Sequence, residues 1–324
     1  NRPRLFIFFS FLNVGVTLLC NLVFIIIFKM NIGSIFLSNL IASLIIFILV
    51  LPYIYQRFRF SSLSIVKWKT ILSFALPFLP AGLFAMAMEV ADRYILKLLT
   101  DLETVGIYNA GYKIGVLMLL VVNGFNMGWQ PYFLEKNFDS RSKIYPRINS
   151  IVLAILGFIW ILLLFWTDDL IRTSFLGITF FGSDFFGSLN IIPWIGLSYF
   201  FYGFYHLQTP GVFLKSRPKY AAWTRLFGAF TNIGLCFLLI PMCGAEGAAY
   251  ATCISFGLMA LSMFCINRYL IFVKLESRSL FIIFLLLIIS YAAFSVYEDS
   301  SIINLIIMFF YIVVIFYFKI INMQ

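Results

Sequence analysis

Residues 71–94 read ILSFALPFLPAGLFAMAMEVADRY, and this stretch decides the fold. Its first eighteen residues carry no charge, a length and polarity that suit a helix crossing a bilayer. Pro77 and Pro80 interrupt this run, free backbone groups and allow the helix to bend. We therefore expect a membrane-spanning helix over 71–91 that leads into a charged connector outside the membrane, beginning at Glu89.

A second hydrophobic run follows at 105–134 and contains one charged residue, Lys113. Lys113 lies about two turns, or roughly 12 Å, past the start of the run. A single ammonium group at that depth is costly unless it faces protein or water. The two runs together predict a membrane bundle with polar space inside it.

Composition supports a membrane protein throughout the chain. Of the 324 residues, 63% are hydrophobic and 11% are charged, and the mean hydropathy is +1.02. A water-soluble domain of this length needs far more charge to cover its surface. The hydrophobic runs lack the period of two that a membrane β-barrel requires.

Ten runs are long enough to cross a bilayer as helices. We expect an all-α, polytopic bundle of ten transmembrane helices. Their ranges are 5–28, 35–55, 71–91, 105–133, 148–166, 189–213, 220–241, 247–271, 280–297 and 302–321.

The charges between these spans predict the orientation. One alternating set of segments holds 18 of the 23 basic residues and three acids, whereas the other set holds four basic residues and ten acids. Because basic residues gather on the cytoplasmic side, both ends of this chain are expected in the cytoplasm. The net charge of +10 then reflects topology, and we expect no nucleic-acid partner.

Residue types that carry common chemistries are sparse. The five cysteines show no CxxC spacing, and one histidine cannot make a metal site alone. We expect no metal and no cofactor. No serine elbow, HExxH, phosphate loop or acidic metal motif occurs, which favours a protein that is not an enzyme.

The sequence contains an internal repeat. Residues 13–15 (NVG) and 33–38 (GSIFLS) correspond to 232–234 (NIG) and 247–252 (GAAYAT), six spans later. Transporters are often built from such duplicated halves. We therefore expect 1–55 to be the last two helices of a first lobe and 70–271 to be a second, six-helix lobe. The segment 56–69 would be a basic cytoplasmic linker, and 272–324 would add two C-terminal helices. Four helices of the first lobe would precede this chain, which is then a fragment or a truncated form.

Several motifs carry a family resemblance. They are PFLPAG at 77–82, DRYIL at 92–96, VGIYNAGYK at 105–113, WQP at 129–131, KSRPK at 215–219 and the segment 232–249. Together they resemble the second lobe of Wzx-type polysaccharide-biosynthesis flippases, which belong to the MATE-like multidrug/oligosaccharidyl-lipid/polysaccharide superfamily.

The resemblance implies a two-lobed, MATE-like architecture with an incomplete first lobe. It also implies a transporter in the bacterial cytoplasmic membrane that translocates undecaprenyl-pyrophosphate-linked oligosaccharide for surface polysaccharide such as O-antigen. Expected partners are this lipid-linked substrate and membrane lipids, with the polysaccharide polymerase and chain-length machinery as candidates. Such a head group cannot cross hydrocarbon unaided, so cationic and aromatic walls are expected.

Six residues of the second hydrophobic run are candidates for lining that passage. Lys113 is the leading one, with the alternative that it reaches the outer interface or pairs with Asp92. Tyr108 and Tyr112 share one helix face. Asn123, Asn126 and Trp129 recur every third residue and form a polar stripe.

The charged connector offers structural or coupling candidates. Glu89 and Arg93 stand four apart and can pair on one helix face. Asp92 and Arg93 either hold the outer end of the span or move a proton.

Two other functions remain open. A MATE-like, cation-coupled drug antiporter needs buried carboxylates, and the expected spans hold no acid near their middle. A membrane glycosyltransferase or polymerase needs a large loop with paired carboxylates, and the segment 167–188 offers only Asp168, Asp169, Arg172 and Asp184. A partner-dependent or inactive remnant is a third interpretation.

Overall fold

The computed structural model describes residues 3–31, 33–55, 65–76, 78–135, 144–172, 174–175, 178–179, 182–271, 276–296 and 301–318. The chain forms two compact units, Asn1–Thr70 and Ile71–Gln324. Pro77 and residues 56–64 of the expected linker lie outside the described residues.

The first unit is a pair of packed helices. Helix α1 (Pro3–Leu22) continues into a short π-helical segment, η1 (Val23–Ile27), and α2 (Gly33–Tyr55) packs against α1. Ser34, Ser38 and Ala42 are buried at every fourth position of α2. Small residues at this spacing let two membrane helices approach closely. Helix α3 (Ile65–Ala75) follows and crosses the boundary between the units.

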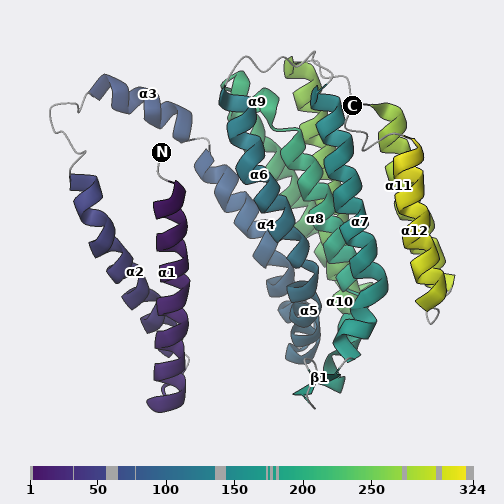
Figure 1. The fold of residues 1–324 in the computed structure, drawn as a ribbon, viewed down its shortest axis with the longest axis horizontal. Helices are drawn as coiled ribbons and strands as arrows, with labels where there is room; N and C mark the ends of the chain where they lie inside the picture. The colour runs from purple at the N-terminus through teal and green to yellow at the C-terminus, as the bar shows by residue number, and fades with distance from the viewer. Residues whose placement is uncertain are drawn as a thin grey trace. The chain divides into compact units, whose positions relative to one another are not determined.

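The second unit is a helix bundle (Figure 1). Its helices are α4 (Phe78–Leu99), α5 (Leu102–Gly115), α6 (Leu117–Glu135), α7 (Ile144–Arg172), α8 (Ile192–Leu207), α9 (Pro210–Leu214), α10 (Lys219–Ile271), α11 (Ser277–Val296) and α12 (Ser301–Tyr317). A two-residue antiparallel ladder, β1 (Ser174–Phe175) with β2 (Ile178–Thr179), and the 3₁₀ helix η3 (Ser183–Ser188) join α7 to α8.

The expected all-α bundle is confirmed, since the described residues of each of the ten expected spans are mainly helical. Within the described residues, six helical segments are long and apolar enough to cross a membrane, and α12 is a shorter apolar helix.

The third span differs from the expectation in its ends. The helix breaks between Ala75 and Phe78, and α4 then continues without interruption to Leu99. Glu89, Asp92 and Arg93 therefore lie within a helix, and the expected charged connector at these residues is wrong. Pro80 lies in the first turn of α4, where its missing N–H breaks no helical hydrogen bond. The span is interrupted before Pro80, between the end of α3 at Ala75 and the start of α4 at Phe78.

The connector between α4 and α5 is instead the short turn at Thr100 and Asp101. The Asp101 carboxylate caps α5 by accepting a hydrogen bond from the Thr104 N–H at 2.7 Å. This bond holds the pKa of Asp101 below its ordinary value. So short a turn places α4 and α5 side by side as an antiparallel pair.

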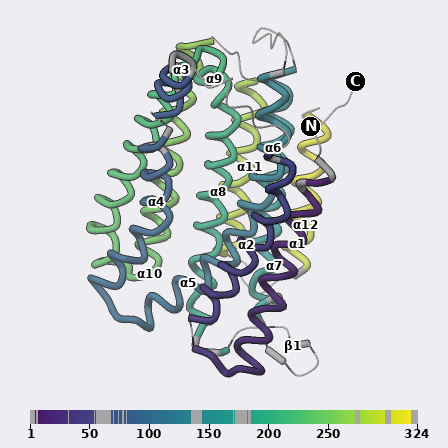
Figure 2. Tube along the Cα trace, turned by 90° about the vertical axis from the view of Figure 1, so that its left-hand side faces the viewer, coloured from purple at the N-terminus to yellow at the C-terminus, as the bar shows by residue number. Residues whose placement is uncertain are grey.

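Helix α10 is a hairpin of two long arms. Gly244, with φ +55° and ψ −130°, separates the arms in a conformation that L side chains rarely adopt. Asn232 of the first arm reaches Thr252 and Ser255 of the second at 3.4 and 3.3 Å. Figure 2 shows α10 beside α4, and the two elements pack along their lengths. The arms match the expected spans 220–241 and 247–271.

Helix α8 lies at the centre of this unit, packed against α5, α6, α7 and α10. It is buried on nearly all its faces, as a helix that is hydrophobic all round must be. Gly111 and Gly115 of α5 face the start of α8, and a Cβ at Gly115 would lie 2.7 Å from the Ile195 Cβ. These glycines let the two backbones approach, as their spacing predicts.

Candidate functional site

Arg93 is the centre of a polar cluster on α4 and α5. Its Nε donates a hydrogen bond to the Asn109 Oδ1 at 2.7 Å, and its Nη1 donates to the Glu89 carbonyl oxygen. The guanidinium lies 4.1 Å from the centre of the Tyr112 ring, a cation–π contact. The side chain is 28% exposed. Arg93 is thus held in one orientation while part of its surface stays open.

Asp92, the residue before Arg93 on α4, is fully buried. Its carboxylate accepts a hydrogen bond from the Tyr108 hydroxyl and another from the Arg93 N–H at 2.7 Å. The Arg93 Nη1 lies 4.0 Å from the same carboxylate. Because a buried charge is tolerated only when it is paired and hydrogen-bonded, these contacts tie α4 to α5. Tyr108 is also fully buried and is committed to Asp92.

Tyr112 connects Arg93 to the central helix. Its hydroxyl lies 2.6 Å from the Tyr199 hydroxyl of α8. Tyr199 begins a tyrosine ladder along α8, with Tyr202 and Tyr205 at three-residue intervals. The Tyr199 and Tyr202 ring centres are 6.4 Å apart, and Tyr202 and Tyr205 are stacked with centres 6.0 Å apart. The ladder places hydroxyl-bearing rings along the interior of the bundle.

Arg225 and His206 lie at the other end of this ladder. The Arg225 guanidinium lies 5.6 Å from the Tyr205 ring centre, and the His206 ring packs edge-on against Tyr202, with centres 4.5 Å apart. His206 is 9% exposed, and its Nε2 has no hydrogen-bond partner among the described residues. Arg225 lies in the second turn of α10, within the expected span 220–241.

Glu89 lies one turn before Arg93 on α4 and is exposed. Its carboxylate is within electrostatic range of Tyr199 and Tyr202 on α8 and of Arg225 on α10. The structure shows no ion pair between Glu89 and Arg93 within the described residues. Arg93 contacts the backbone carbonyl of Glu89 instead, so the expected pairing of their side chains is wrong.

The remaining candidates occupy different surroundings. Lys113, in the last turn of α5, is exposed, and it lies one turn after Asn109, the partner of Arg93. On α6, Asn123 is exposed and Asn126 is half-buried. Trp129 is 3% exposed and packs against Phe133 and Tyr145, with ring centres 5.6 and 5.7 Å away. The expected stripe therefore splits, with Trp129 in the core.

A second polar network lies at the junction of α8 and α9. The Asn267 Nδ2 donates to the Tyr145 hydroxyl and to the Gln208 Oε1, and its Oδ1 accepts from the Gly211 N–H at 2.9 Å. The Gln208 Nε2 donates to the Asn149 Oδ1 at 2.8 Å. All of these groups are buried, so the network joins α7, α9 and α10 and has a structural role.

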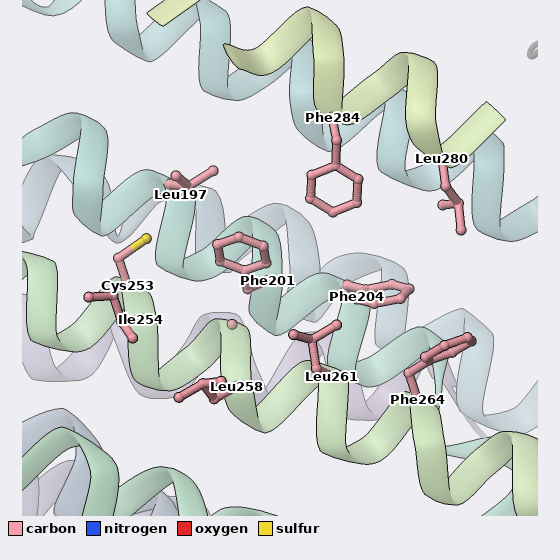
Figure 3. Close-up of a pocket in the computed structure, with 11 residues that line it drawn as sticks. Leu197, Phe201, Phe204, Cys253, Ile254, Leu258, Leu261, Phe264, Leu280 and Phe284 are labelled. Carbon is pink, nitrogen blue, oxygen red and sulfur yellow. The ribbon is translucent and has the colours of Figure 1, made fainter. Parts of the chain in front are cut away.

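An apolar groove runs between α8, the second arm of α10 and α11. Figure 3 shows Phe284 and Leu280 of α11 above Phe201 and Phe204 of α8, with α10 side chains along the other edge. Its volume is about 560 Å³. The lining is aliphatic and aromatic apart from Cys253, so it offers no group to bind a sugar or a phosphate. The polar cluster is the site that could hold such groups.

The described residues offer no candidate metal site. Among the described residues, no three histidine, cysteine or carboxylate side chains gather as a metal site. The cluster instead combines guanidinium groups with phenol rings, which suits anions and polar rings.

These features define a polytopic membrane protein with a cationic and aromatic site inside its larger unit. Residues 10–136 match the family described as "Polysaccharide biosynthesis protein". The match covers the motifs at 77–82, 92–96, 105–113 and 129–131, and the resemblance that these motifs carry is thereby confirmed. No curated protein sequence matches the chain.

The fold is similar to that of a solved structure described as "Lipid II flippase MurJ, inward closed conformation". The TM-score is 0.63 and the sequence identity is 17%, over 96% of this chain and 67% of that one. At this identity the likeness concerns the fold, and it supports the flippase-type helix arrangement expected from the sequence.

Proposed function

We propose that this chain is a flippase that translocates undecaprenyl-pyrophosphate-linked oligosaccharide across the bacterial cytoplasmic membrane. The family description and the fold of a lipid II flippase support this class of activity. The observation that carries the proposal is Arg93, a part-exposed guanidinium fixed by Asn109 and Tyr112 within an apolar bundle.

Arg93 would bind a phosphate oxygen of the head group. Its Nε and Nη1 are occupied by Asn109 and Glu89, and no described residue accepts a hydrogen bond from Nη2. A guanidinium with donors already oriented binds phosphate at a low entropic cost. Lys113, on the same side of α5 as Asn109, would add a second positive charge. The two cations would offset the charge of a diphosphate that cannot enter hydrocarbon alone.

The tyrosine ladder would contact the sugars. A phenol ring presents an apolar face and a hydroxyl, which suits the mixed surface of a sugar ring. Tyr202 is half-buried, and Tyr112 and Tyr199 are nearly covered. We therefore assign sugar contact to Tyr202, and we assign Tyr112 and Tyr199 to holding Arg93.

The charge distribution supports a cytoplasmic position for both ends of the chain. The partners of such a flippase would be the polysaccharide polymerase and the chain-length machinery, which use the translocated oligosaccharide. Asn123 and Asn126, exposed and half-buried on α6, would extend the polar surface toward the cytoplasmic side.

A cation-coupled antiporter is the second candidate, because Asp92 is fully buried within α4. Such an acid is what an antiporter needs. Here, however, both carboxylate oxygens are occupied, one by the Tyr108 hydroxyl and one by the Arg93 N–H. This arrangement favours a structural role for Asp92 over an exchangeable ion.

The test reconstitutes the full chain in liposomes with lipid-linked oligosaccharide labelled in its sugars, and measures the labelled fraction in each leaflet. We expect equilibration between leaflets that slows in Lys113→Ala. In cells, Lys113→Ala should reduce surface polysaccharide and accumulate the lipid-linked unit on the inner leaflet. Efflux of a cationic drug, without movement of the lipid, would replace the flippase proposal with the antiporter.

A further inference from the structure

We infer that Arg225, with Tyr205 and His206, forms a second phosphate-binding station, so that the head group passes between Arg225 and Arg93 along the tyrosine ladder. The inference rests on the proposed function and extends it, because it assigns an order of contacts within the same unit.

The surroundings of Arg225 resemble those of Arg93. Each guanidinium lies against a tyrosine ring, Tyr205 in one case and Tyr112 in the other, at 5.6 and 4.1 Å from the ring centre. Both tyrosines belong to one connected set of rings that includes Tyr199 and Tyr202. The two cations therefore lie at the two ends of this connected set of rings.

His206 gives an independent indication of a ligand. Its side chain is more than nine-tenths buried, and its Nε2 has no partner among the described residues. An imidazole packed between Tyr202 and Tyr205 can donate a hydrogen bond to a phosphate oxygen or accept one from a sugar hydroxyl. A buried polar atom costs free energy unless something bonds to it, and a bound head group would do so.

The distance between the stations makes them sequential. Tyr199, which meets Tyr112 and thus the Arg93 end, precedes Tyr205 by six residues, or about 9 Å along α8. The two ends of the ladder are therefore different positions along α8, and we take them as successive stations for the head group. The exposed Glu89, one turn before Arg93 on α4, would repel the anion near Arg93 and thereby favour its release from that station.

The test measures the binding of inorganic pyrophosphate to the purified full chain by equilibrium dialysis, in the wild type and in Arg93→Gln, Arg225→Gln and Arg225→Lys. Lys97→Gln and Lys219→Gln are matched controls, because each removes an exposed charge from the same helix, α4 or α10. Thermal unfolding of each variant reports whether it folds.

We expect two pyrophosphates per wild-type chain and per control chain. Arg93→Gln and Arg225→Gln should each lose one site, with affinity falling at least tenfold there, and Arg225→Lys should retain it. Loss of the same single site in both glutamine variants would overturn the inference, as would two intact sites in Arg225→Gln or an absence of binding by the wild type. If Arg225→Gln does not fold, Arg225→Lys decides: because lysine keeps the charge but lacks the planar donors, it should keep both sites and weaken one of them, and two sites of wild-type affinity would overturn the inference.

A measurement of lipid flipping distinguishes a failure of the proposed function from a failure of the second phosphate-binding station. A wild type that binds two pyrophosphates but moves no lipid-linked oligosaccharide contradicts the proposed function and leaves the two stations in place. A wild type that moves the lipid, with an Arg225→Gln variant equally fast and with both sites intact, contradicts the second station alone.

Discussion

The Tyr112 hydroxyl of α5 lies 2.6 Å from the Tyr199 hydroxyl of α8. This contact joins α5, whose Asn109 and Tyr112 contact Arg93, to the centre of the bundle. Tyr112→Phe or Tyr199→Phe should each leave one buried hydroxyl without this partner, at a cost of about 1–3 kcal/mol. The double variant should cost less than the sum of the two, since it leaves neither hydroxyl behind. Chemical unfolding in detergent measures this, and strict additivity would show that the hydroxyls do not interact.

Replacement of Arg93 by lysine should reduce the rate of flipping. Lysine keeps the charge but cannot donate from Nε to Asn109 or present the planar group that lies on Tyr112. We expect Arg93→Gln to reduce flipping at least tenfold and Arg93→Lys to recover part of that loss. Lys97→Gln, one turn further along α4, should flip at the wild-type rate. Equal activity of Arg93→Gln and wild type would remove Arg93 from the site.

Asn267 should matter for stability more than for transport. Its amide bonds to Tyr145, Gln208 and the Gly211 N–H. Asn267→Leu removes the partner of the Gln208 Oε1 and of the Gly211 N–H, whereas the Tyr145 hydroxyl keeps its bond to the Leu207 carbonyl. We expect a loss of about 1–3 kcal/mol for each of the two groups that finds no other partner. Ser262→Ala, on the same arm of α10, removes only a hydroxyl bonded to a carbonyl of its own helix and serves as the control. A wild-type unfolding midpoint in Asn267→Leu would refute the structural role.

Gly115 should accept no larger residue. A Cβ there would lie 2.7 Å from the Ile195 Cβ, so Gly115→Val must push α5 away from α8. We expect lower stability and lost flipping, because Tyr112 and Tyr199 would separate. Gly124→Ala, at a position of α6 where a Cβ meets nothing within 4 Å, should fold and flip normally. An unfolding midpoint that is unchanged in Gly115→Val would contradict the close packing.

Asp101 should make the start of α5 sensitive to acid. Its pKa in the folded chain is lowered from the ordinary value of 3.8, chiefly by the Thr104 N–H. The cap is therefore fully effective above that value and is lost as pH falls through the lower, folded pKa. Amide exchange of the first turn of α5 should stay slow at neutral pH and accelerate in acid. Asp101→Asn, which caps when uncharged, should remove the acceleration, and its persistence would assign the effect to another group.

The spans were predictable because a bilayer imposes length and hydrophobicity on every helix that crosses it. The close approach of α5 to α8 was also predictable, since Gly111 and Gly115 stand one turn apart. The site was less predictable. Asp92 and Arg93 look like a connector in sequence, and only the pairing of α4 with α5 brings Tyr108 and Asn109, sixteen residues away, to them.

Arg225 was missed for a similar reason. It stands near Lys215, Arg217 and Lys219, and a cluster of basic residues predicts a cytoplasmic loop. The expected span 220–241 already contains Arg225, but only the packing of α10 on α8 brings it to Tyr205. The three-residue spacing of Tyr199, Tyr202 and Tyr205 was the available signal, although the same pattern is typical of an aromatic belt at a membrane interface.

We expect Arg93 and Lys113 to face water rather than lipid. The most direct measurement is the reaction of Lys113→Cys, in a chain whose five native cysteines are replaced by serine or alanine, with a charged thiosulfonate that cannot enter hydrocarbon. We predict rapid modification that lipid-linked oligosaccharide slows. Modification only by a lipid-soluble maleimide, at a rate that the substrate does not change, would contradict the claim.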